Sequence, residues 1–306
     1  MELSNLLNAM PGAIAQGLIW GIMAIGLYIT YKVLDFSDLT VDGTMATGGA
    51  VFAMLTIAGW NMWPAMLIAV LAGMAAGLLT GLFHTAMGIP PILSGILTQF
   101  SLYSINLWIM GFKANTGLNS RIYPVLINAK KLTEISVHNP IFIMLVVTAA
   151  VIAILYWFFG TELGCALRAT GANQSMARAQ GINTNFCKIL GLMIANGIVT
   201  LASALFTQYQ GMADVNAGRG AIVIGLAAVI IGDVIFGKLF KNFALKLLSV
   251  SIGAVIYYIV IQVILWLGLD SNMLKLLSAV VVAIFLAIPY WKSKILPAKK
   301  GVGNRA

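Results

Sequence analysis

The chain has 306 residues, 60% of them hydrophobic and 9% charged, and its mean hydropathy is +0.97. Charged residues make up about a quarter of an ordinary soluble domain, so the composition excludes that class and predicts an all-α polytopic membrane protein. The net charge of +9 is expected to lie mostly on a cytoplasmic face next to the anionic lipid of the bilayer, and no nucleic-acid partner is implied.

Apolar runs predict about nine transmembrane helices in a single membrane domain over residues 1–306. A helix needs about 20 mostly apolar residues to cross a bilayer. Met1–Met10 lacks the basic cluster and the cleavage pattern of a signal peptide, so the first run is expected to be a retained span. The predicted spans are Gly12–Thr30, Thr44–Gly59, Pro64–His84, Ile92–Phe112, Pro140–Phe159, Cys187–Thr207, Ala221–Phe236, Leu247–Leu267 and Met273–Tyr290.

The distribution of Lys and Arg predicts the orientation of these spans. Twelve basic residues fall on the side of the loop at residues 160–186 and six on the other side, which together are the 18 of the chain. Basic residues favour the cytoplasmic side of a membrane. The loop is therefore predicted to be cytoplasmic, with the N-terminus outside and the C-terminus inside.

An acidic block precedes the second predicted span, which is short for a complete crossing. Its three aspartates are spaced by three and four residues, so they would share one face of a helix. A carboxylate at membrane depth costs about 2.5–3.5 kcal/mol on the insertion scale. We interpret the block as the break of a discontinuous helix that serves as a structural gate, with a proton relay or cation site as the alternative. The residues are Asp35, Asp38, Thr40 and Asp42.

Two rows of uncharged polar residues occur within predicted spans. They favour two interpretations about equally: a wet pathway for a polar solute, or hydrogen bonds between helices, which contribute about 0.6 kcal/mol each. One row is Asn196, Thr200, Ser203 and Thr207, and the other is Ser94, Thr98 and Ser101, with Gln99 and Asn106 beside it. The glycine-rich stretch Gly73–Gly81 predicts close helix packing instead.

Isolated ionisable and thiol residues give no sign of a catalytic or metal centre. His84 and His138 lack ligand spacing, and Cys165 and Cys187 are predicted to be free thiols. The sequence contains no phosphate-loop motif Gly-x-x-x-x-Gly-Lys-Ser/Thr, so the chain is not expected to hydrolyse ATP. The chain is predicted not to be an enzyme and to hold no metal or cofactor of its own.

The longest polar interval of the second half is Gly160–Asn183. Thr161 and Asn173 can cap helix N-termini with their side-chain oxygens, and Gly171 and Gly181 can end helices in the left-handed conformation. The interval is predicted to contain two short helices. Such helices need a surface to lie on, which is the cytoplasmic face of the chain or a soluble partner; a solvated connector is the alternative.

Several short blocks occur in a characteristic order along the chain. They are Asp38-Leu39-Thr40-Val41, Thr161-Glu162-Leu163-Gly164, Leu167-Arg168-Ala169 followed by Gly171 and Asn173, Gly181-Ile182-Asn183, and Gly225-Leu226-Ala227-Ala228-Val229-Ile230-Ile231-Gly232. These blocks resemble permease subunits of ABC importers, in the group that serves branched-chain amino acids, ribose and related sugars, and lipoprotein-delivered nucleosides. Asp233 departs from the small residues usual at that point and is expected to pair with Lys238.

The resemblance implies a subunit of the cell membrane of a prokaryote that offers a gated path. A separate pair of cytoplasmic ABC ATPase subunits would bind ATP and Mg and would seat the loop at residues 160–186. An extracytoplasmic substrate-binding protein would deliver the solute, and the outer loop Lys113–Asn139 would meet it or be a solvated connector. Because the ATPases work in pairs, we predict a homodimer, with a heterodimer as the alternative. The residues expected to couple to the ATPase are Glu162, Gly164, Arg168, Gly171, Ala172, Asn173, Ala177, Arg178 and Gly181.

The resemblance says less about the substrate. Val33–Gly43 is similar to a subgroup assigned to amino acids, aromatic ones included, and departs from the Gly-Ile-Asp-Leu-Ser form of sugar permeases. We predict import of a small polar solute, an amino acid, with a sugar or nucleoside as the alternative. An ion-coupled secondary transporter is the alternative of another class, and it would need ionisable residues in mid-membrane.

Overall fold

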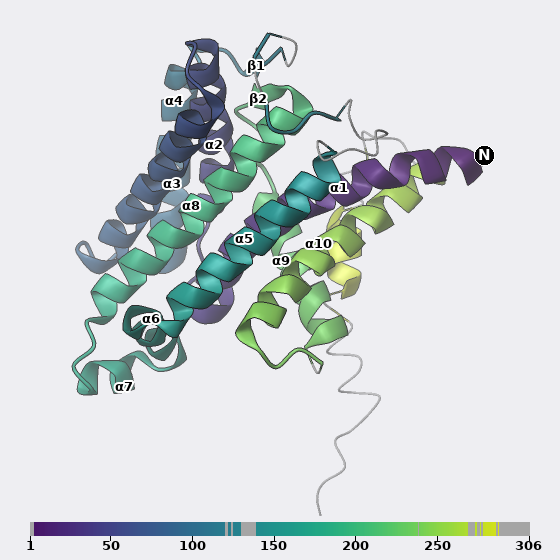
Figure 1. Cartoon of the computed structure of the whole chain (residues 1–306). Helices are drawn as coiled ribbons and strands as arrows, with labels where there is room; N and C mark the ends of the chain where they lie inside the picture. The colour runs from purple at the N-terminus through teal and green to yellow at the C-terminus, as the bar shows by residue number, and fades with distance from the viewer. Residues whose placement is uncertain are drawn as a thin grey trace, which may run out of the picture.

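The computed structural model describes residues 3–119, 122–123, 125–129, 139–237, 239–268 and 278–285, with residues 273, 276 and 287. These residues form a helical bundle (Figure 1). Six helices of the described chain are long and apolar enough to cross a membrane. They are α1 (Leu3–Tyr28, continued to Val33), α3 (Met62–Thr85), α4 (Pro91–Ile109), α5 (Pro140–Gly160), α8 (Thr184–Gln210) and α10 (Phe243–Trp266).

The first eight predicted spans each overlap one helix. Two of these helices, α2 (Thr40–Ile57) and α9 (Ala221–Phe236), do not meet the length and hydropathy of a complete crossing by themselves. The ninth predicted span, Met273–Tyr290, lies partly outside the described residues. Residues 278–285 are helical, and Val281 and Val282 pack in one apolar cluster with α10. The count of nine therefore stays a prediction.

The predicted break lies between α1 and α2. The last turn of α1 widens into a π-helix, η1 (Ile29–Val33), and the chain is then irregular until α2 begins. Asp35 adopts a left-handed backbone conformation with φ of +53°, which a non-glycine residue rarely takes. Since residues 34–39 are not helical, the three aspartates do not share a helix face as predicted.

Glycine residues permit a close helix contact between α3 and α8. Gly73, Gly77 and Gly81 follow one another at intervals of four, on one face of α3. A Cβ at Gly77 would overlap the backbone carbonyl of Leu192 in α8, and one at Gly81 would lie 3.0 Å from Ile189 Cα. The two backbones approach because no side chain separates them, so the predicted close packing is confirmed.

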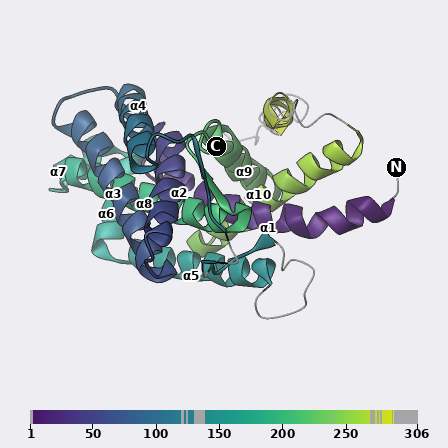
Figure 2. The ribbon, with the colours of Figure 1, turned by 90° about the horizontal axis from the view of Figure 1, so that it is seen from above.

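The helices form two groups that meet along α1 and α8. One group holds α2, α3, α4 and α8, and the other holds α1, α9 and α10, with α5 crossing the lower edge in the view from above (Figure 2). In the second group α1 packs along α10, with Gly17 and Gly21 facing the backbone of Val255 and Ser251. A continuous buried cluster of apolar side chains joins the groups.

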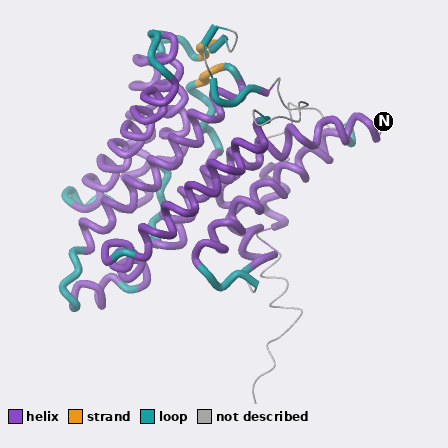
Figure 3. The backbone as a smooth tube through the Cα atoms, viewed as in Figure 1, coloured by secondary structure: helices purple, strands orange, loops and turns teal. Residues whose placement is uncertain are grey.

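The connections between helices gather at two ends of the bundle (Figure 3). One end carries two short antiparallel strands, β1 (Asn115–Gly117) and β2 (Met212–Asp214), with Thr116 opposite Ala213. The other end carries two short helices, α6 (Glu162–Ala172) and α7 (Gln174–Ala179). We name the two ends after the predicted orientation, so that the end with α6 and α7 is the coupling end and the end with the strands is the outer end.

The outer loop Lys113–Asn139 packs on its own chain where it is described. Leu118 N donates to Gly211 O at 2.7 Å, and Leu126 N donates to Gln208 Oε1 at 2.8 Å. This part of the loop therefore covers the end of α8 and is not a solvated connector. Residues 130–138, which include His138, lie outside the described residues.

Candidate functional site

Asp38 is the centre of a polar network buried at the break. Its side chain is 4% exposed. Oδ1 accepts a hydrogen bond of 2.9 Å from Thr40 N, at the start of α2, and Oδ2 accepts one of 2.8 Å from Asn196 Nδ2 on α8. Asn196 Oδ1 in turn accepts from Thr44 Oγ1 at 2.9 Å. These hydrogen bonds fix the first turn of α2 against α8, which is the structural part of the predicted role of Asp38.

A line of threonine hydroxyls extends the network across α3 and α4. Thr40 Oγ1 lies 2.7 Å from Thr80 Oγ1, and Thr80 Oγ1 donates to Thr98 Oγ1 at 2.8 Å. Thr98 Oγ1 donates to the backbone oxygen of Ser94 at 3.1 Å. Either hydroxyl can be the donor in the contact between Thr40 and Thr80. The buried Thr98 therefore joins helices.

The polar row on α8 lies inside the bundle and not on an accessible face. Its members are Asn196, Thr200, Ser203 and Thr207, all at most 3% exposed. Ser203 Oγ donates to Met45 O on α2, and a Cβ at Gly49 would come 2.5 Å from Thr207 Oγ1. In the described structure these side chains pack between α8, α2 and α3. This packing favours the interhelical interpretation of the row, and the wet pathway stays a prediction.

The row on α4 is divided between two environments. Ser94, Thr98 and Asn106 are buried against α2 and α3, whereas Ser101 is exposed and donates to Leu97 O of its own helix at 2.9 Å. Gln99 is partly buried. Of the five residues predicted for the pathway on this helix, Gln99 and Asn106 line a pocket.

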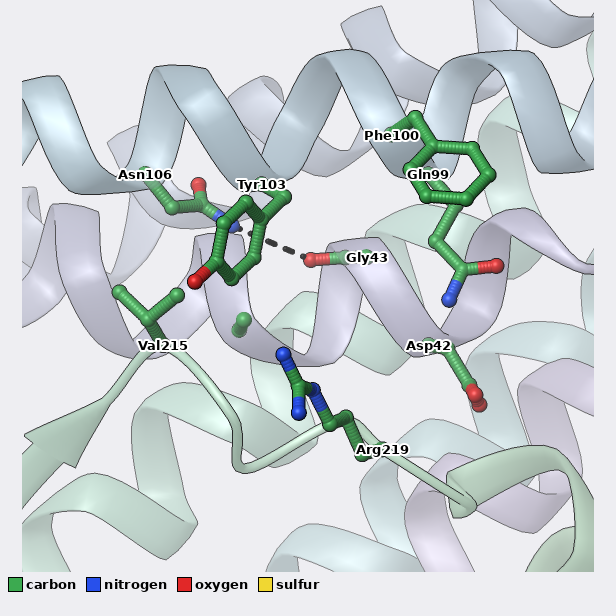
Figure 4. A pocket seen from close by; sticks show the side chains of 9 residues that line it. Asp42, Gly43, Gln99, Phe100, Tyr103, Asn106, Val215 and Arg219 are labelled. Atoms are coloured by element: carbon green, nitrogen blue, oxygen red, sulfur yellow. Dashed lines mark hydrogen bonds between the residues drawn. The ribbon is translucent and has the colours of Figure 1, made fainter. Parts of the chain in front are cut away.

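The pocket lies between α4, the first turns of α2 and the segment that links β2 to α9 (Figure 4). We call it the α4 pocket, and its volume is about 220 Å³. It is lined by Asp42, Gly43, Ala46, Gln99, Phe100, Tyr103, Asn106, Val215 and Arg219. The linking segment lies directly on α2, since a Cβ at Gly218 would overlap the carbonyl group of Asp42.

Polar groups from three elements meet in the α4 pocket. Asn106 Nδ2 donates to Gly43 O at 3.4 Å, and its Oδ1 has no hydrogen-bond partner among the described residues although it is fully buried. The guanidinium carbon of Arg219 lies 5.8 Å from the centre of the Tyr103 ring, a cation–π distance. Figure 4 shows the guanidinium turned toward Tyr103. The pocket thus combines an unpaired carbonyl, a cation and aromatic rings.

Asp42 positions the wall of the α4 pocket. Its Oδ2 accepts a hydrogen bond of 3.2 Å from Gly220 N, and its Oδ1 accepts one of 3.0 Å from Ile222 N. Both donors belong to the first turn of α9, whose N–H groups lack partners within the helix. The carboxylate of α2 therefore caps α9, which is the structural part of its predicted role, and the gate stays a prediction. Asp35, by contrast, is exposed at the break.

Tyr103, Phe100 and Arg219 were not among the predicted site residues. In the sequence, Tyr103 and Phe100 are typical of the apolar residues of a span, and Arg219 is typical of a charged residue in a loop. They come together because the segment after β2 returns to α4. A signal for Arg219 existed, since it is the single basic residue between α8 and α9.

Capping at the coupling end follows the prediction at three of four positions. Thr161 Oγ1 accepts from Gly164 N at 3.3 Å and Asn173 Oδ1 accepts from Met176 N at 3.0 Å. Gly181 is left-handed with φ of +82°. Gly171 is not left-handed: it lies within α6, where a Cβ would overlap the carbonyl group of Val33 in η1. Its small size serves contact between α6 and the break.

The nine residues expected to couple to an ATPase fall into two groups. Glu162, Arg168, Ala172, Asn173, Arg178 and Gly181 are exposed. Gly164 and Ala177 are buried and Gly171 packs on Val33, so these three residues stabilise α6 and α7 and do not offer a surface to a partner. The large apolar residue that α7 exposes is Met176, at 59%, which was not among the predicted residues.

A protein-family model described as "Branched-chain amino acid transport system / permease component" matches residues 10–289. The chain belongs to this permease family. The tyrosine transport system permease protein of Clostridioides difficile (strain R20291) is 40% identical over 281 residues, which are 92% of this chain and 91% of that protein. The ribose import permease protein RbsC of Escherichia coli (strain K12) is 25% identical over 289 residues, with shares of 94% and 85%.

A solved structure shares the fold of the permease. PsaBC from Streptococcus pneumoniae in complex with Fab superposes with a TM-score of 0.54 at 15% identity, over 96% of this chain and 99% of that chain. The permease is thus a multi-pass membrane subunit of a prokaryotic ABC importer, and the predicted family and fold class are confirmed. A permease of such a system works with an ATPase and a substrate-binding protein.

A hydrogen bond and an ion pair hold the coupling end of the permease together. Lys188 Nζ lies 3.0 Å from His84 Nε2, and His84 Nδ1 lies 2.8 Å from Ile89 O. Asp233 Oδ2 pairs with Lys32 Nζ at 2.9 Å, whereas Lys238, its predicted partner, lies outside the described residues. Within the described residues no group of three or more His, Cys, Asp and Glu side chains is placed to hold a metal.

Proposed function

We propose that this permease imports an amino acid, aromatic ones included, and that the solute passes the α4 pocket. The observation that carries the proposal is the meeting of Arg219, Tyr103 and the unpaired Asn106 Oδ1 in one pocket. The similarity to a tyrosine transport permease supports the same class of solute.

The groups of the α4 pocket complement the two charges of an amino acid. The guanidinium of Arg219 offers donors in the planar geometry that suits a carboxylate. The Gln99 amide oxygen can accept from the ammonium group, and the buried Asn106 Oδ1 is the acceptor that becomes available when the pocket opens. The rings of Phe100 and Tyr103 can stack on an apolar or aromatic side chain. A small pocket with few polar groups holds such a solute briefly, as passage requires.

The ATPase pair is proposed to dock on the exposed faces of α6 and α7. Leu163, Met176 and Phe186 are exposed apolar residues at the coupling end, and the exposed residues of the predicted coupling set lie around them. Because Gly171 lies directly on Val33, a displacement of α6 is transmitted to the break without an intervening side chain. The network of Asp38 then connects the break to α2, which forms one wall of the α4 pocket.

Uptake by reconstituted vesicles tests this proposal. The permease, its ATPase and its binding protein are placed in sealed vesicles, and the accumulation of labelled tyrosine, leucine and ribose is measured with ATP and with a proton ionophore. We expect ATP-dependent uptake of an amino acid that the ionophore leaves unchanged. Uptake that needs the proton gradient, or uptake of ribose alone, would contradict the proposal.

A variant of the α4 pocket tests the route. Arg219→Gln removes a charged donor, and a hydrogen bond to a charged group contributes about 1.5–3 kcal/mol. We therefore expect uptake to fall about ten- to a hundredfold while the ATPase still co-purifies. Arg219→Lys, which keeps the positive charge at the same position, is the matched control and should retain more uptake than Arg219→Gln. Equal uptake by the two variants would show that the solute does not pass the α4 pocket.

A further inference from the structure

Two adjoining cavities lie at the coupling end, where three membrane helices end or begin. One has a volume of about 370 Å³ and lies between η1, α6 and the start of α10; the other, of about 570 Å³, lies between the end of α5 and the start of α10. They share Arg168, Lys241 and Phe243. Both volumes are within the range of ligand sites, roughly 300–1,000 Å³.

The walls of the joined cavities carry an excess of positive charge. The first cavity is lined by four cations, Lys32, Arg168, Lys241 and Lys246. Within the described part of the chain, the one carboxylate within 4 Å of any of them is that of Asp233, which pairs with Lys32 at 2.9 Å. Arg168 of α6, Lys241 of the connection before α10 and Lys246 of α10 thus line one cavity, and no described carboxylate lies within 4 Å of them. Such a space favours an anion.

Aromatic residues place the cavities at the level of the lipid headgroups. The second cavity is lined by Tyr156 and Trp157, whose side chains are 51% and 72% exposed on α5. They lie in the last turns of that helix, just before Gly160. Exposed Trp and Tyr at helix ends are typical of the membrane–water interface. The apolar rings of Phe159 and Phe243, 4.8 Å apart, form the wall toward the bilayer core.

We propose that this joined cavity binds the phosphate headgroup of an anionic phospholipid. Arg168, Lys241 and Lys246 hold the phosphate, and the acyl chains leave along Trp157 and Phe243 on the outside of α5 and α10. Basic pockets between membrane helices on the cytoplasmic side are suited to such headgroups. A protein partner fits this position less well, because the aromatic wall faces the bilayer. Arg168 then contributes to lipid binding, although the sequence assigned it to the ATPase contact.

Quenching of Trp157 fluorescence tests the proposal. The full chain is reconstituted in phosphatidylcholine vesicles with increasing fractions of phosphatidylglycerol brominated in its acyl chains, and brominated phosphatidylcholine serves as the neutral reference. The signal of Trp157 is the difference between the chain and its Trp157→Phe variant. We expect the anionic lipid to quench Trp157 at a fraction several times lower than the neutral lipid does.

Charge variants identify the cations that cause this preference. A basic residue near the membrane surface changes lipid affinity by about fivefold, so Lys241→Gln and, independently, Lys246→Gln should each weaken the preference by about that factor. Lys113→Gln, at the opposite end of the bundle, should leave it unchanged. A preference that survives in both cavity variants overturns the proposal, as does equal quenching by the two lipids.

Two further outcomes would assign the cavity to another ligand. If millimolar inorganic phosphate in the buffer abolishes the quenching preference, the cavity is a site for a free anion and the lipid proposal fails. If Lys241→Gln leaves quenching unchanged but lowers co-purification of the ATPase, the cations belong to a protein interface and the proposal also fails.

Discussion

At the scale of single residues, the permease provides two aspartates of the break with hydrogen-bond partners from distant parts of the chain. Asp38 is bonded by Thr40 and Asn196, and Asp42 by the first turn of α9. A buried acceptor or ion without a partner costs more than the same group when paired. Lys188, only 7% exposed, is the corresponding cation at the coupling end.

The pair of Lys188 and His84 leads to a prediction for the free energy of unfolding. The carbonyl of Ile89 can only accept, so His84 Nδ1 carries the hydrogen and Nε2 of the neutral ring accepts from Lys188. His84→Leu leaves the ammonium without this acceptor and should lower the free energy of unfolding by about 1–3 kcal/mol. Denaturant titration of the purified permease in detergent measures the change.

The double variant is the control for this pair. His84→Leu with Lys188→Met replaces both polar partners by apolar groups of similar size, so most of the lost free energy of unfolding should return. Equal instability of the single and double variants would show that the contact between the two side chains is not what stabilises this region.

At the scale of elements, glycine contacts position the helices, and the sequence indicates these contacts. The break is positioned by hydrogen bonds to distant residues, which the sequence does not indicate. The spacing of Gly73, Gly77 and Gly81 predicts one small-residue face, because a helix repeats every 3.6 residues. The polar rows were ambiguous since hydroxyl groups line wet pathways and helix interfaces alike. The choice between the two interpretations depends on which helix faces the row. For Ser203 of α8 that helix is α2.

A matched pair of alanine substitutions tests the α3–α8 contact. At Gly77 a new Cβ overlaps the Leu192 carbonyl, and at Gly160 it meets nothing within 4 Å. Gly77→Ala should lower the free energy of unfolding by about 1–3 kcal/mol, the usual cost of overpacking. Gly160→Ala should be neutral, or slightly stabilising because alanine is favoured in helices. If both variants unfold at the same temperature, the close contact between α3 and α8 does not contribute to the free energy of unfolding.

At the scale of the whole molecule, composition and apolar runs could predict the class of protein and the position of most helices. Hydropathy along the sequence indicates the membrane helices directly, because the bilayer requires long apolar helices. The α4 pocket could not be predicted, since it depends on Arg219 returning to Tyr103 from another element. The predicted orientation of the termini and the pairing of two copies likewise depend on a membrane and a partner.

Cross-linking tests the predicted homodimer. Ser101 is exposed on α4 beside the α4 pocket, while Ser203 is buried and cannot meet a second copy. In a chain with Cys165→Ser and Cys187→Ser, a Ser101→Cys variant should form a disulfide between two copies on mild oxidation. Leu145→Cys is the control, because Leu145 is exposed on α5, at the opposite edge of the bundle (Figure 2).

Two results would contradict the homodimer about α4. The first is equal cross-linking at both positions, which indicates random collision in the membrane. The second is no cross-link at Ser101→Cys in complexes that contain two ATPase subunits for each single permease chain, which indicates a different second permease.

The partners of the break also determine when it can form during synthesis. Asp38 bonds to a residue 158 positions later in the chain, and Asp42 to one 180 positions later. Ribosomes add about 5–20 residues per second, so these carboxylates wait on the order of ten to forty seconds for their partners. Over that time the start of α2 can contact α3 and α4, which are synthesised soon after it, but not α8 or α9. The break therefore acquires its last partners only when more than two thirds of the chain has been made.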